Sequence, residues 1–328
     1  MRSRGSGLLN WADCALLVPD KSMPPSLNKG YLVTGGSFLI WGLVPLFWTQ
    51  LEGISAFELI HHRILWSLGF VAVLIALRGR MHEYLHALRS GSLARLSVLS
   101  GLLLTANWLI FIWAVHHGRV IETSLGYFIA PFVNTGLALI VLRERIGPIH
   151  ALALGLAMAG VGIQLFDHGG FPWFALGLAF SFGFYGLLRK QSPLGSMTGL
   201  GVETTLLAPF AIGMLLLFHL DGSGALGRVD LSTHLWLAAT GVVTAIPLLL
   251  FATGARLIPL SSVAILQFIT PSVSLLLGVF VYREPFGALR LTSFILIWIG
   301  LALFLVNTTA KVSRPASPAP RLSSGTPV

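Results

Sequence analysis

Four ionisable side chains lie close together in the apolar stretch "ELIHHRILWS": Glu58, His61, His62 and Arg63. Glu58 and His62 are four residues apart and share one face of a helix, whereas Arg63 must bend back to reach Glu58. Burial raises the pKa of a carboxyl and a nearby arginine lowers it, so a moving partner can make such a group bind and release protons. The cluster predicts a proton-linked Glu58 beside an Arg63 that holds a polar or anionic group or gates a cavity. Alternatively, Glu58 is a helix-start carboxylate that the helix dipole stabilises.

Further polar or amphipathic side chains interrupt other apolar stretches. They are Asn107, Trp108, Tyr127, Asn134, Glu203 and Gln267. Together with the first cluster they are candidates to line a cavity for an amphiphilic or aromatic solute, with Glu203 as the second candidate for proton coupling. Two plainer roles remain open, because amides inside apolar helices also join neighbouring helices by hydrogen bonds and Glu203 also suits a helix cap.

Residue patterns typical of enzymes and metal sites are missing from the sequence. The histidine pairs 61–62 and 116–117 are adjacent, so their side chains point about 100° apart on a helix and only one of each pair can face a common ion. No zinc-protease, nucleophile-elbow or P-loop motif occurs. The net charge of +9 comes from short basic clusters between apolar runs, unlike the continuous basic surface of a nucleic-acid-binding protein. We therefore predict no metal, no cofactor, no nucleic-acid partner and no enzyme activity.

The apolar stretches themselves predict the fold class. The chain has 328 residues, of which 55% are hydrophobic and only 10% charged, and a helix needs about 20 apolar residues to cross a bilayer. Ten stretches are long enough, which predicts an all-α, polytopic membrane protein embedded in a lipid bilayer. They are residues 30–51, 56–77, 96–116, 120–142, 148–166, 171–189, 199–220, 233–254, 258–282 and 287–306.

The distribution of lysine and arginine predicts the orientation of these spans. With the N-terminus in the cytoplasm, 16 of the 21 Lys and Arg residues fall on the cytoplasmic side, as the positive-inside rule requires. Both termini are then cytoplasmic. Residues 1–29 are predicted to form a flexible leader, with the start at either Met1 or Met23, and residues 307–328 a disordered Pro- and Ser-rich tail.

An internal repeat organises the spans into two units, residues 30–166 and 171–306. When the chain is shifted so that Pro131 falls on Pro271, the stretch "FIAPFVNTGLALIVLRE" falls on "FITPSVSLLLGVFVYRE". With a small gap, Glu58 falls on Glu203. Five spans per unit is an odd number, so the two units are inverted relative to each other, as in many secondary transporters. The two prolines are predicted to bend equivalent helices, because each removes one backbone hydrogen bond.

Several stretches together resemble the RarD group of EamA-type transporters in the drug/metabolite transporter superfamily. They are "GYLVTGGSFLIWGLVPLFW", "ELIHHRILWS", "NWLIFIWAVHHGRVIETSLGYFIAPFVN", "VVTAIPLLLFATGAR" and "QFITPSVSLLLGVFVYREPF". The resemblance implies ten spans, a multi-pass protein of the bacterial inner membrane with both termini inside, and a central cavity between the two five-helix halves.

Repeat, buried polar residues and resemblance together predict a secondary active transporter. It would move a small organic metabolite or drug-like solute by alternating access, coupled to a proton or another ion, as a monomer or homodimer. The alternative is a non-transporting membrane factor or an intramembrane enzyme with an unrecognised site.

Overall fold

The computed structural model describes residues 27–312, except residues 118–119, 169–170 and 284–286. Within these ranges all regular structure is helical and no strand occurs. The elements are α2 (Leu27–Leu43), α3 (Pro45–Trp48), the 3-10 helix η1 (Thr49–Leu51), α4 (Ala56–Leu77), α5 (Met81–Arg89), α6 (Gly91–His116), α7 (Val120–Ile140), α8 (Pro148–His168), α9 (Trp173–Gln191), α10 (Ser196–Leu220), α11 (Leu231–Leu257), α12 (Leu260–Leu266), α13 (Ile269–Phe280) and α14 (Ala288–Val312).

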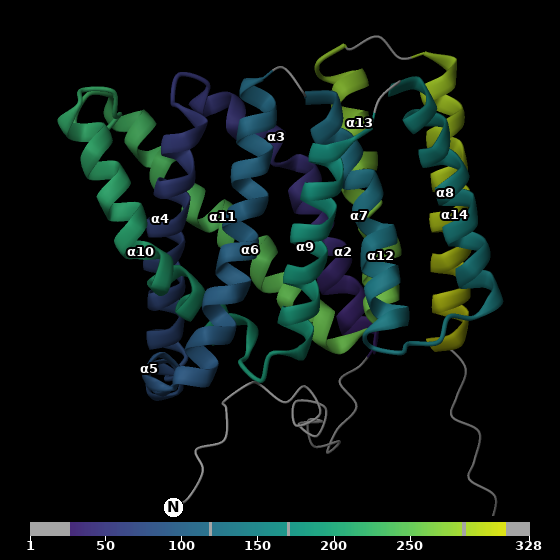
Figure 1. Cartoon of the computed structure of the whole chain (residues 1–328), viewed down its shortest axis with the longest axis horizontal. Coiled ribbons are helices and arrows are strands. Elements are labelled where there is room, and N and C mark those ends of the chain that lie inside the picture. The colour runs from purple at the N-terminus through teal and green to yellow at the C-terminus, as the bar shows by residue number, and fades with distance from the viewer. Residues whose placement is uncertain (1–26, 118–119, 169–170, 284–286, 313–328) are drawn as a thin grey trace, which may run out of the picture.

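The long helices run between two opposite faces of the molecule (Figure 1). α2 begins and α14 ends on the same face, which we call the terminal face; the opposite one is the far face. Large apolar side chains cover the outside, among them Phe166, Ile140 and Leu77, which are 91%, 80% and 78% exposed. So much exposed apolar surface is typical of a protein that contacts lipid rather than water.

Within the described residues, nine helical segments are long and apolar enough to cross a membrane, which is one fewer than the sequence predicts. The remaining long helix is α9, with 19 residues. It ends in the polar sequence Arg189-Lys190-Gln191, and more than half of its residues are buried. Because α9 packs against α7, α6 and α11, it has little surface that must be apolar to suit lipid.

The starts of four helices in each half repeat along the chain with one constant shift. The pairs Ala56 and Ser196, Gly91 and Leu231, Val120 and Leu260, and Pro148 and Ala288 are all separated by the shift that places Pro131 on Pro271. Among the described residues other than glycine, only Arg143 and Arg283 have positive φ, at 52° and 54°, and the same shift relates them. A left-handed residue other than glycine is uncommon, so this match is strong evidence for the repeat.

Contacts between the halves are reciprocal. A Cβ atom on Gly160 would lie 2.5 Å from the carbonyl oxygen of Ser293, and one on Gly300 would lie 2.6 Å from that of Ala153. Gly160 and Gly300 are equivalent in the repeat, as are Ala153 and Ser293. A contact in which i meets j and j meets i is the mark of a two-fold relation. The outermost pair α8 and α14 therefore cross at equivalent glycines.

Two predicted features of the repeated helices need correction. The stretch 258–282 is not one helix, because it divides into α12 and α13 around Gln267 and Phe268. Pro271 then lies in the first turn of α13, where no helical hydrogen bond is lost, whereas Pro131 lies inside the continuous helix α7. The prolines are therefore equivalent in sequence but not in local structure.

The predicted chain ends also differ in part from the structure. α2 begins at Leu27 and α14 continues to Val312, so residues 27–29 and 307–312 are helical rather than leader or tail. The predicted leader before residue 27 and the tail after residue 312 lie outside the described residues.

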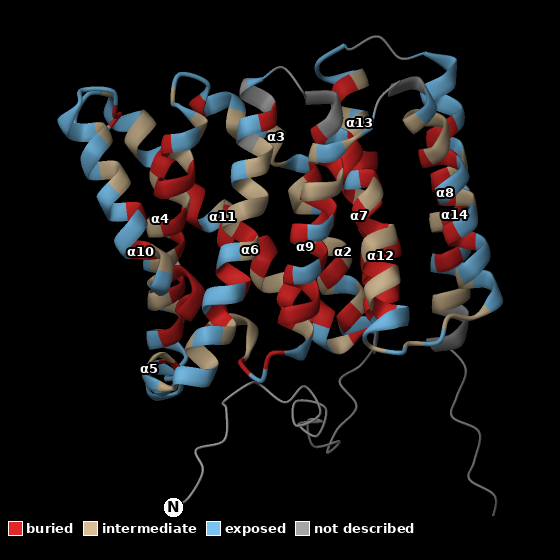
Figure 2. Cartoon of the chain, in the orientation of Figure 1, coloured by how far each residue is buried: buried red, intermediate tan, exposed pale blue. Residues whose placement is uncertain are grey.

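Buried residues concentrate where the two halves meet (Figure 2). Five aromatic side chains from α2, α9 and α11 form a connected cluster there: Phe38, Trp41, Phe182, Tyr185 and Phe251. By contrast, the outward surfaces of α8, α10 and α14 are largely exposed (Figure 2). The core of the molecule is thus shared by both halves, and the polar residues of interest lie around it.

Candidate functional site

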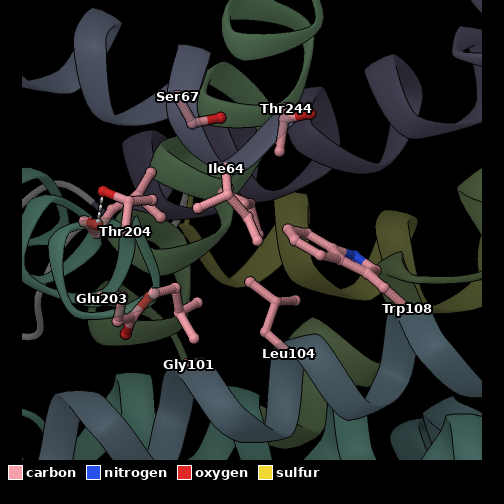
Figure 3. A pocket seen from close by; sticks show the side chains of 11 residues that line it. Ile64, Ser67, Gly101, Leu104, Trp108, Glu203, Thr204 and Thr244 are labelled. Carbon is pink, nitrogen blue, oxygen red and sulfur yellow. Dashed lines mark hydrogen bonds between the residues drawn. The ribbon is translucent and has the colours of Figure 1, made fainter. Parts of the chain in front are cut away.

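A narrow cavity lies between α4 and α6 of the first half and α10 and α11 of the second (Figure 3). It has room for about one water molecule. Most of its lining is apolar, and Glu203 and Trp108 lie towards opposite ends of the labelled side chains (Figure 3). The lining residues are Ile64, Ser67, Gly101, Leu104, Trp108, Leu200, Glu203, Thr204, Leu207, Thr244 and Leu248.

At one end of the cavity, the carboxylate of Glu203 is buried together with a cation. Its Oε1 accepts a hydrogen bond from Oγ of Ser100 at 2.6 Å and one from Nη1 of Arg189 at 3.2 Å. Glu203 and Arg189 are each only 1% exposed. Taking two charges out of water costs several kcal/mol per ion, so such a pair is stable only with good geometry and further hydrogen bonds.

Arg189 fits into this position because of a glycine. The arginine lies near the end of α9, and its Nη2 donates to the carbonyl oxygen of Ser196 at 3.2 Å. A Cβ atom on Gly199 would lie 2.1 Å from Nη1 of Arg189, so no larger residue leaves room for the guanidinium. Nevertheless, Nε of Arg189 and Oε2 of Glu203 have no hydrogen-bond partner among the described residues. The pair is charge-balanced, but its hydrogen bonding is incomplete.

Behind the lining residues Trp108 and Thr244 at the other end, Arg63 lies among aromatic rings. Its guanidinium carbon is 4.4 Å from the ring centroid of Trp108 and 5.1 Å from that of Trp48, and its Nε donates to Oγ1 of Thr244 at 2.9 Å. Tyr127 of α7 lies within electrostatic reach of it. Within the described part of the chain, no carboxylate forms an ion pair with Arg63. Arg63 is thus held by cation–π contacts and one hydroxyl.

Glu58 does not share this space with Arg63. In the first turn of α4, its Oε1 accepts a hydrogen bond from the backbone N–H of Ala225 at 2.7 Å, and Nε2 of His62 lies 3.5 Å away. Ala225 belongs to the loop between α10 and α11 on the far face. Glu58 therefore ties the first half to this loop, which is the kind of structural role that its place at a helix start allows.

The predicted amides join helices to one another. Nδ2 of Asn107 donates to the carbonyl oxygen of Leu178 and to Oγ of Ser181, both at 2.9 Å, which links α6 to α9. Nδ2 of Asn134 donates to Oε1 of Gln267 at 2.8 Å. This second bond joins α7 of the first half to the break between α12 and α13 of the second.

A further carboxylate joins the halves at the terminal face. Glu144, just after α7, accepts hydrogen bonds from the backbone N–H groups of Leu260 and Ser261 at 2.8 and 3.0 Å. Nζ of Lys190 lies 3.9 Å from it. Glu144 therefore caps the start of α12 and neutralises part of the positive end of that helix. Its repeat counterpart, Glu284, lies outside the described residues.

Sequence reasoning missed several partners of the predicted residues. Arg189 enters the sequence analysis only as one of the 16 basic residues counted on the cytoplasmic side, and its pairing with Glu203 depends on how the α9–α10 connection folds. Thr244 and Ser100 are single hydroxyl residues inside apolar helices, and no spacing distinguishes them from hydroxyls that bond their own helix. Trp48 was part of the apolar stretch. The repeat alone offered a signal for Thr244. Its shift aligns Thr244 with Leu104, and both residues line the cavity.

The ungapped repeat also corrects one predicted correspondence. Because one constant shift relates the starts of α4, α6, α7 and α8 to those of α10, α11, α12 and α14, Glu203 is the counterpart of Arg63, and Thr198 is the counterpart of Glu58. Arg63 and Glu203 occupy the same position in their helices, counted from opposite faces. The two halves thus place opposite charges at equivalent depths.

No group of three or more His, Cys, Asp or Glu side chains that could hold a metal ion occurs in the described ranges. His61 instead bonds its own helix, since its Nδ1 lies 2.7 Å from the carbonyl oxygen of Phe57. The geometry around the cavity therefore depends on arginine, carboxylate, hydroxyl and aromatic groups.

Helical membrane spans in two related halves, with buried polar groups between them, define a polytopic membrane protein. The sequence model of the EamA-like transporter family matches residues 28–166 and again residues 172–306. The chain therefore belongs to the EamA-like transporter family.

Relatives among known proteins agree with this assignment. The chain is 42% identical to the uncharacterized transporter YojE of Bacillus subtilis over 282 residues, which cover 84% of this chain and 93% of YojE. It is 38% identical to protein RarD of Escherichia coli K12 over 281 residues, with 85% and 95% covered. These similarities confirm the resemblance to the RarD group.

A solved structure described as "Crystal structure of protein" superposes with a TM-score of 0.68. The match covers 86% of this chain and 99% of the solved chain at 17% sequence identity. At that identity the likeness supports the fold alone.

Proposed function

We propose that this transporter moves a small organic solute by alternating access and that Glu203 couples the movement to protons. The carrying observation is that Glu203 is a buried carboxylate in the wall of a cavity shared by both halves, paired with an arginine whose hydrogen bonding is incomplete. A carboxylate in such surroundings changes its affinity for a proton when its cationic partner moves away.

Geometry favours Glu203 over Glu58 for this role. Glu58 is occupied by the backbone N–H of Ala225 and lies beside His62 at the far face, away from the lining of the cavity. The charged and polar groups that face Glu203 are Arg189 and Tyr185 from α9 and Ser100 from α6. A shift of α9 relative to α10 would separate Arg189 from Glu203. The buried carboxylate would then lack its cation and would bind a proton at that stage of the transport cycle.

In the proposed orientation the terminal face is cytoplasmic and the protein is in the cell inner membrane. The predicted excess of Lys and Arg on one side falls on this face, which includes α5 and the ends of α7 and α9. A reporter fused after Lys311 should then be active in the cytoplasm, and one in the loop 221–230 outside. An external C-terminus would overturn the orientation.

Transport in sealed vesicles tests the coupling. A metabolite and drug screen in cells that lack or overproduce the protein first identifies a transported solute. In proteoliposomes, Glu203→Gln should then abolish flux driven by a pH gradient, whereas Glu58→Gln should leave it intact. Equal pH-driven flux in the wild type and in Glu203→Gln would contradict the proposal.

The same preparation separates this function from the alternative. We propose that the protein is not an enzyme, so the purified protein in detergent should leave the solute chemically unchanged. Turnover of the solute without a sealed compartment would favour an intramembrane enzyme instead.

A further inference from the structure

We infer that Arg63 binds the carboxylate of a planar organic anion, whose ring lies against Trp108 and Tyr127. This inference rests on the proposed transport function, because it names the solute class that would bind beside Arg63, next to the cavity.

The first step is the missing counter-ion. A charged side chain within a membrane span is costly unless another group compensates it. Glu203, the repeat counterpart of Arg63, has such a compensating ion in Arg189. Arg63 has none among the described residues, and the stretch "LFWTQL" (residues 46–51), which corresponds to the end of α9 in the repeat, carries no charge.

The second step concerns the free donors. Arg63 uses Nε to hold Thr244, and no hydrogen bond joins Nη1 or Nη2 to any acceptor in the described ranges. These two atoms are also not among the fully enclosed polar atoms without a partner. They therefore reach accessible space, and two parallel N–H groups of a guanidinium match the two oxygens of a carboxylate.

The third step concerns the shape of the space. The rings of Trp48 and Trp108 both lie within cation–π distance of the guanidinium. Tyr127 lies within electrostatic reach of Arg63 and is 45% exposed, although α7 packs against α9, α12 and α8. An anion on Arg63 is therefore bordered by aromatic faces, and these favour a flat, apolar ring over a compact hydrated ion.

Equilibrium binding to the purified protein in detergent tests this inference without transport. The probes are indole-3-carboxylate, its neutral analogue indole-3-carboxamide, and inorganic phosphate, each measured by isothermal titration calorimetry. We expect the carboxylate to bind about 10- to 100-fold more tightly than the carboxamide, as a charge-assisted pair in a poorly hydrated site predicts. Equal affinities for the two indoles, or tighter binding of phosphate than of indole-3-carboxylate, would overturn the inference.

Variants locate the site. Arg63→Gln should remove the preference for the carboxylate, Arg63→Lys should restore part of it, and Arg228→Gln should leave it unchanged, because Arg228 lies in the exposed loop on the far face. A preference that survives in Arg63→Gln would refute the assignment. If Arg63→Gln does not fold, the comparison of the two indoles on the wild type still decides between the outcomes. The two proposals can fail separately. If the wild type prefers indole-3-carboxylate but Glu203→Gln still shows pH-driven transport, proton coupling by Glu203 is contradicted and anion binding by Arg63 is supported.

Discussion

The positions of Arg63 and Glu203 are equivalent in the two halves but are satisfied in different ways. Glu203 is 1% exposed and has its own cation and a hydroxyl donor, whereas Arg63 is partly exposed and has aromatic rings and one hydroxyl. The repeat fixes the depth of both residues, but the local partners fix their chemistry. Under the two proposals above, Glu203 would bind a proton when Arg189 moves away, and Arg63 would receive an external anion.

A second difference between the halves lies in how tightly the helices cross at the cavity. A Cβ atom on Gly241 of α11 would lie 2.3 Å from the carbonyl carbon of Trp66 in α4. The equivalent Gly101 of α6 is looser, since its Cβ atom would lie 3.4 Å from Cδ1 of Leu207. The cavity opens at the looser crossing, where both Gly101 and Leu207 line it.

The largest effect is expected from removing the space around Arg189. Gly199→Ala places a methyl group where Nη1 of Arg189 lies and should displace the arginine from Glu203. Separating a buried ion pair costs about 3–5 kcal/mol, so the melting temperature in detergent should fall steeply and the yield should drop. Gly213→Ala in the same helix is the matched control, because no atom lies within 4 Å of its added Cβ. Equal melting temperatures for the two variants would show that the pair contributes little.

The next effect separates the two helix crossings. Gly241→Ala should force α11 away from Trp66 and destabilise the protein by about 1–3 kcal/mol, as overpacking of a core does. Gly101→Ala adds the same methyl group beside the flexible side chain of Leu207 and should be nearly neutral. Thermal unfolding of both variants in one detergent measures the difference. If Gly101→Ala is the more harmful of the two, the tighter crossing is not the one described.

A smaller effect is expected at the terminal face, where Glu144 joins the halves. Glu144→Gln keeps the shape of the side chain but removes the charge that attracts Lys190 and the first N–H groups of α12. The loss of a charged helix cap costs about 1 kcal/mol. Hydrogen exchange should rise at Leu260 and Ser261 but not in α14, and unchanged exchange at the two amides would argue against the cap.

The smallest effect is expected at the far face, in the loop that Glu58 also contacts. Asp230 caps α11 by accepting hydrogen bonds from the hydroxyl and backbone N–H of Thr233. The bond from the hydroxyl of Thr233 holds the pKa of the Asp230 carboxyl below its usual value. The cap is therefore complete above that usual value and is lost as the pH falls through the lowered one. The protection factor of the Thr233 amide, which corrects for the slower intrinsic exchange at low pH, should fall at acid pH, and Asp230→Asn should flatten this dependence. A parallel fall of the protection factor in Asp230→Asn would contradict the cap.

Periodicity and hydropathy predict most of the fold, because long apolar stretches have few alternatives to a membrane-spanning helix. They do not predict the break at Gln267, since "AILQFITPSV" is as apolar as a continuous span. They also do not indicate that α9 differs from the other long helices in being surrounded mostly by protein. What decides these cases is how neighbouring helices pack, which hydropathy does not contain.

Individual site candidates depend on the sequence in a similar way. Charge inside an apolar stretch is conspicuous, so the sequence indicates Glu58, Arg63 and Glu203 as candidates. It does not indicate their partners, because Arg63 contacts Thr244 and two tryptophans rather than Glu58. The gapped alignment paired Glu58 with Glu203 because both are glutamates. The starts of α4 and α10 instead align Glu203 with Arg63.

The most direct test of the central claim measures which carboxyl group exchanges protons. An infrared difference spectrum of the lipid-reconstituted protein, taken between mildly acidic and mildly alkaline pH, reports protonated carboxyl groups by their C=O stretching band and needs no transported solute. We predict a titrating band in the wild type and in Glu58→Gln that is absent from Glu203→Gln. A band that persists unchanged in Glu203→Gln would contradict the account.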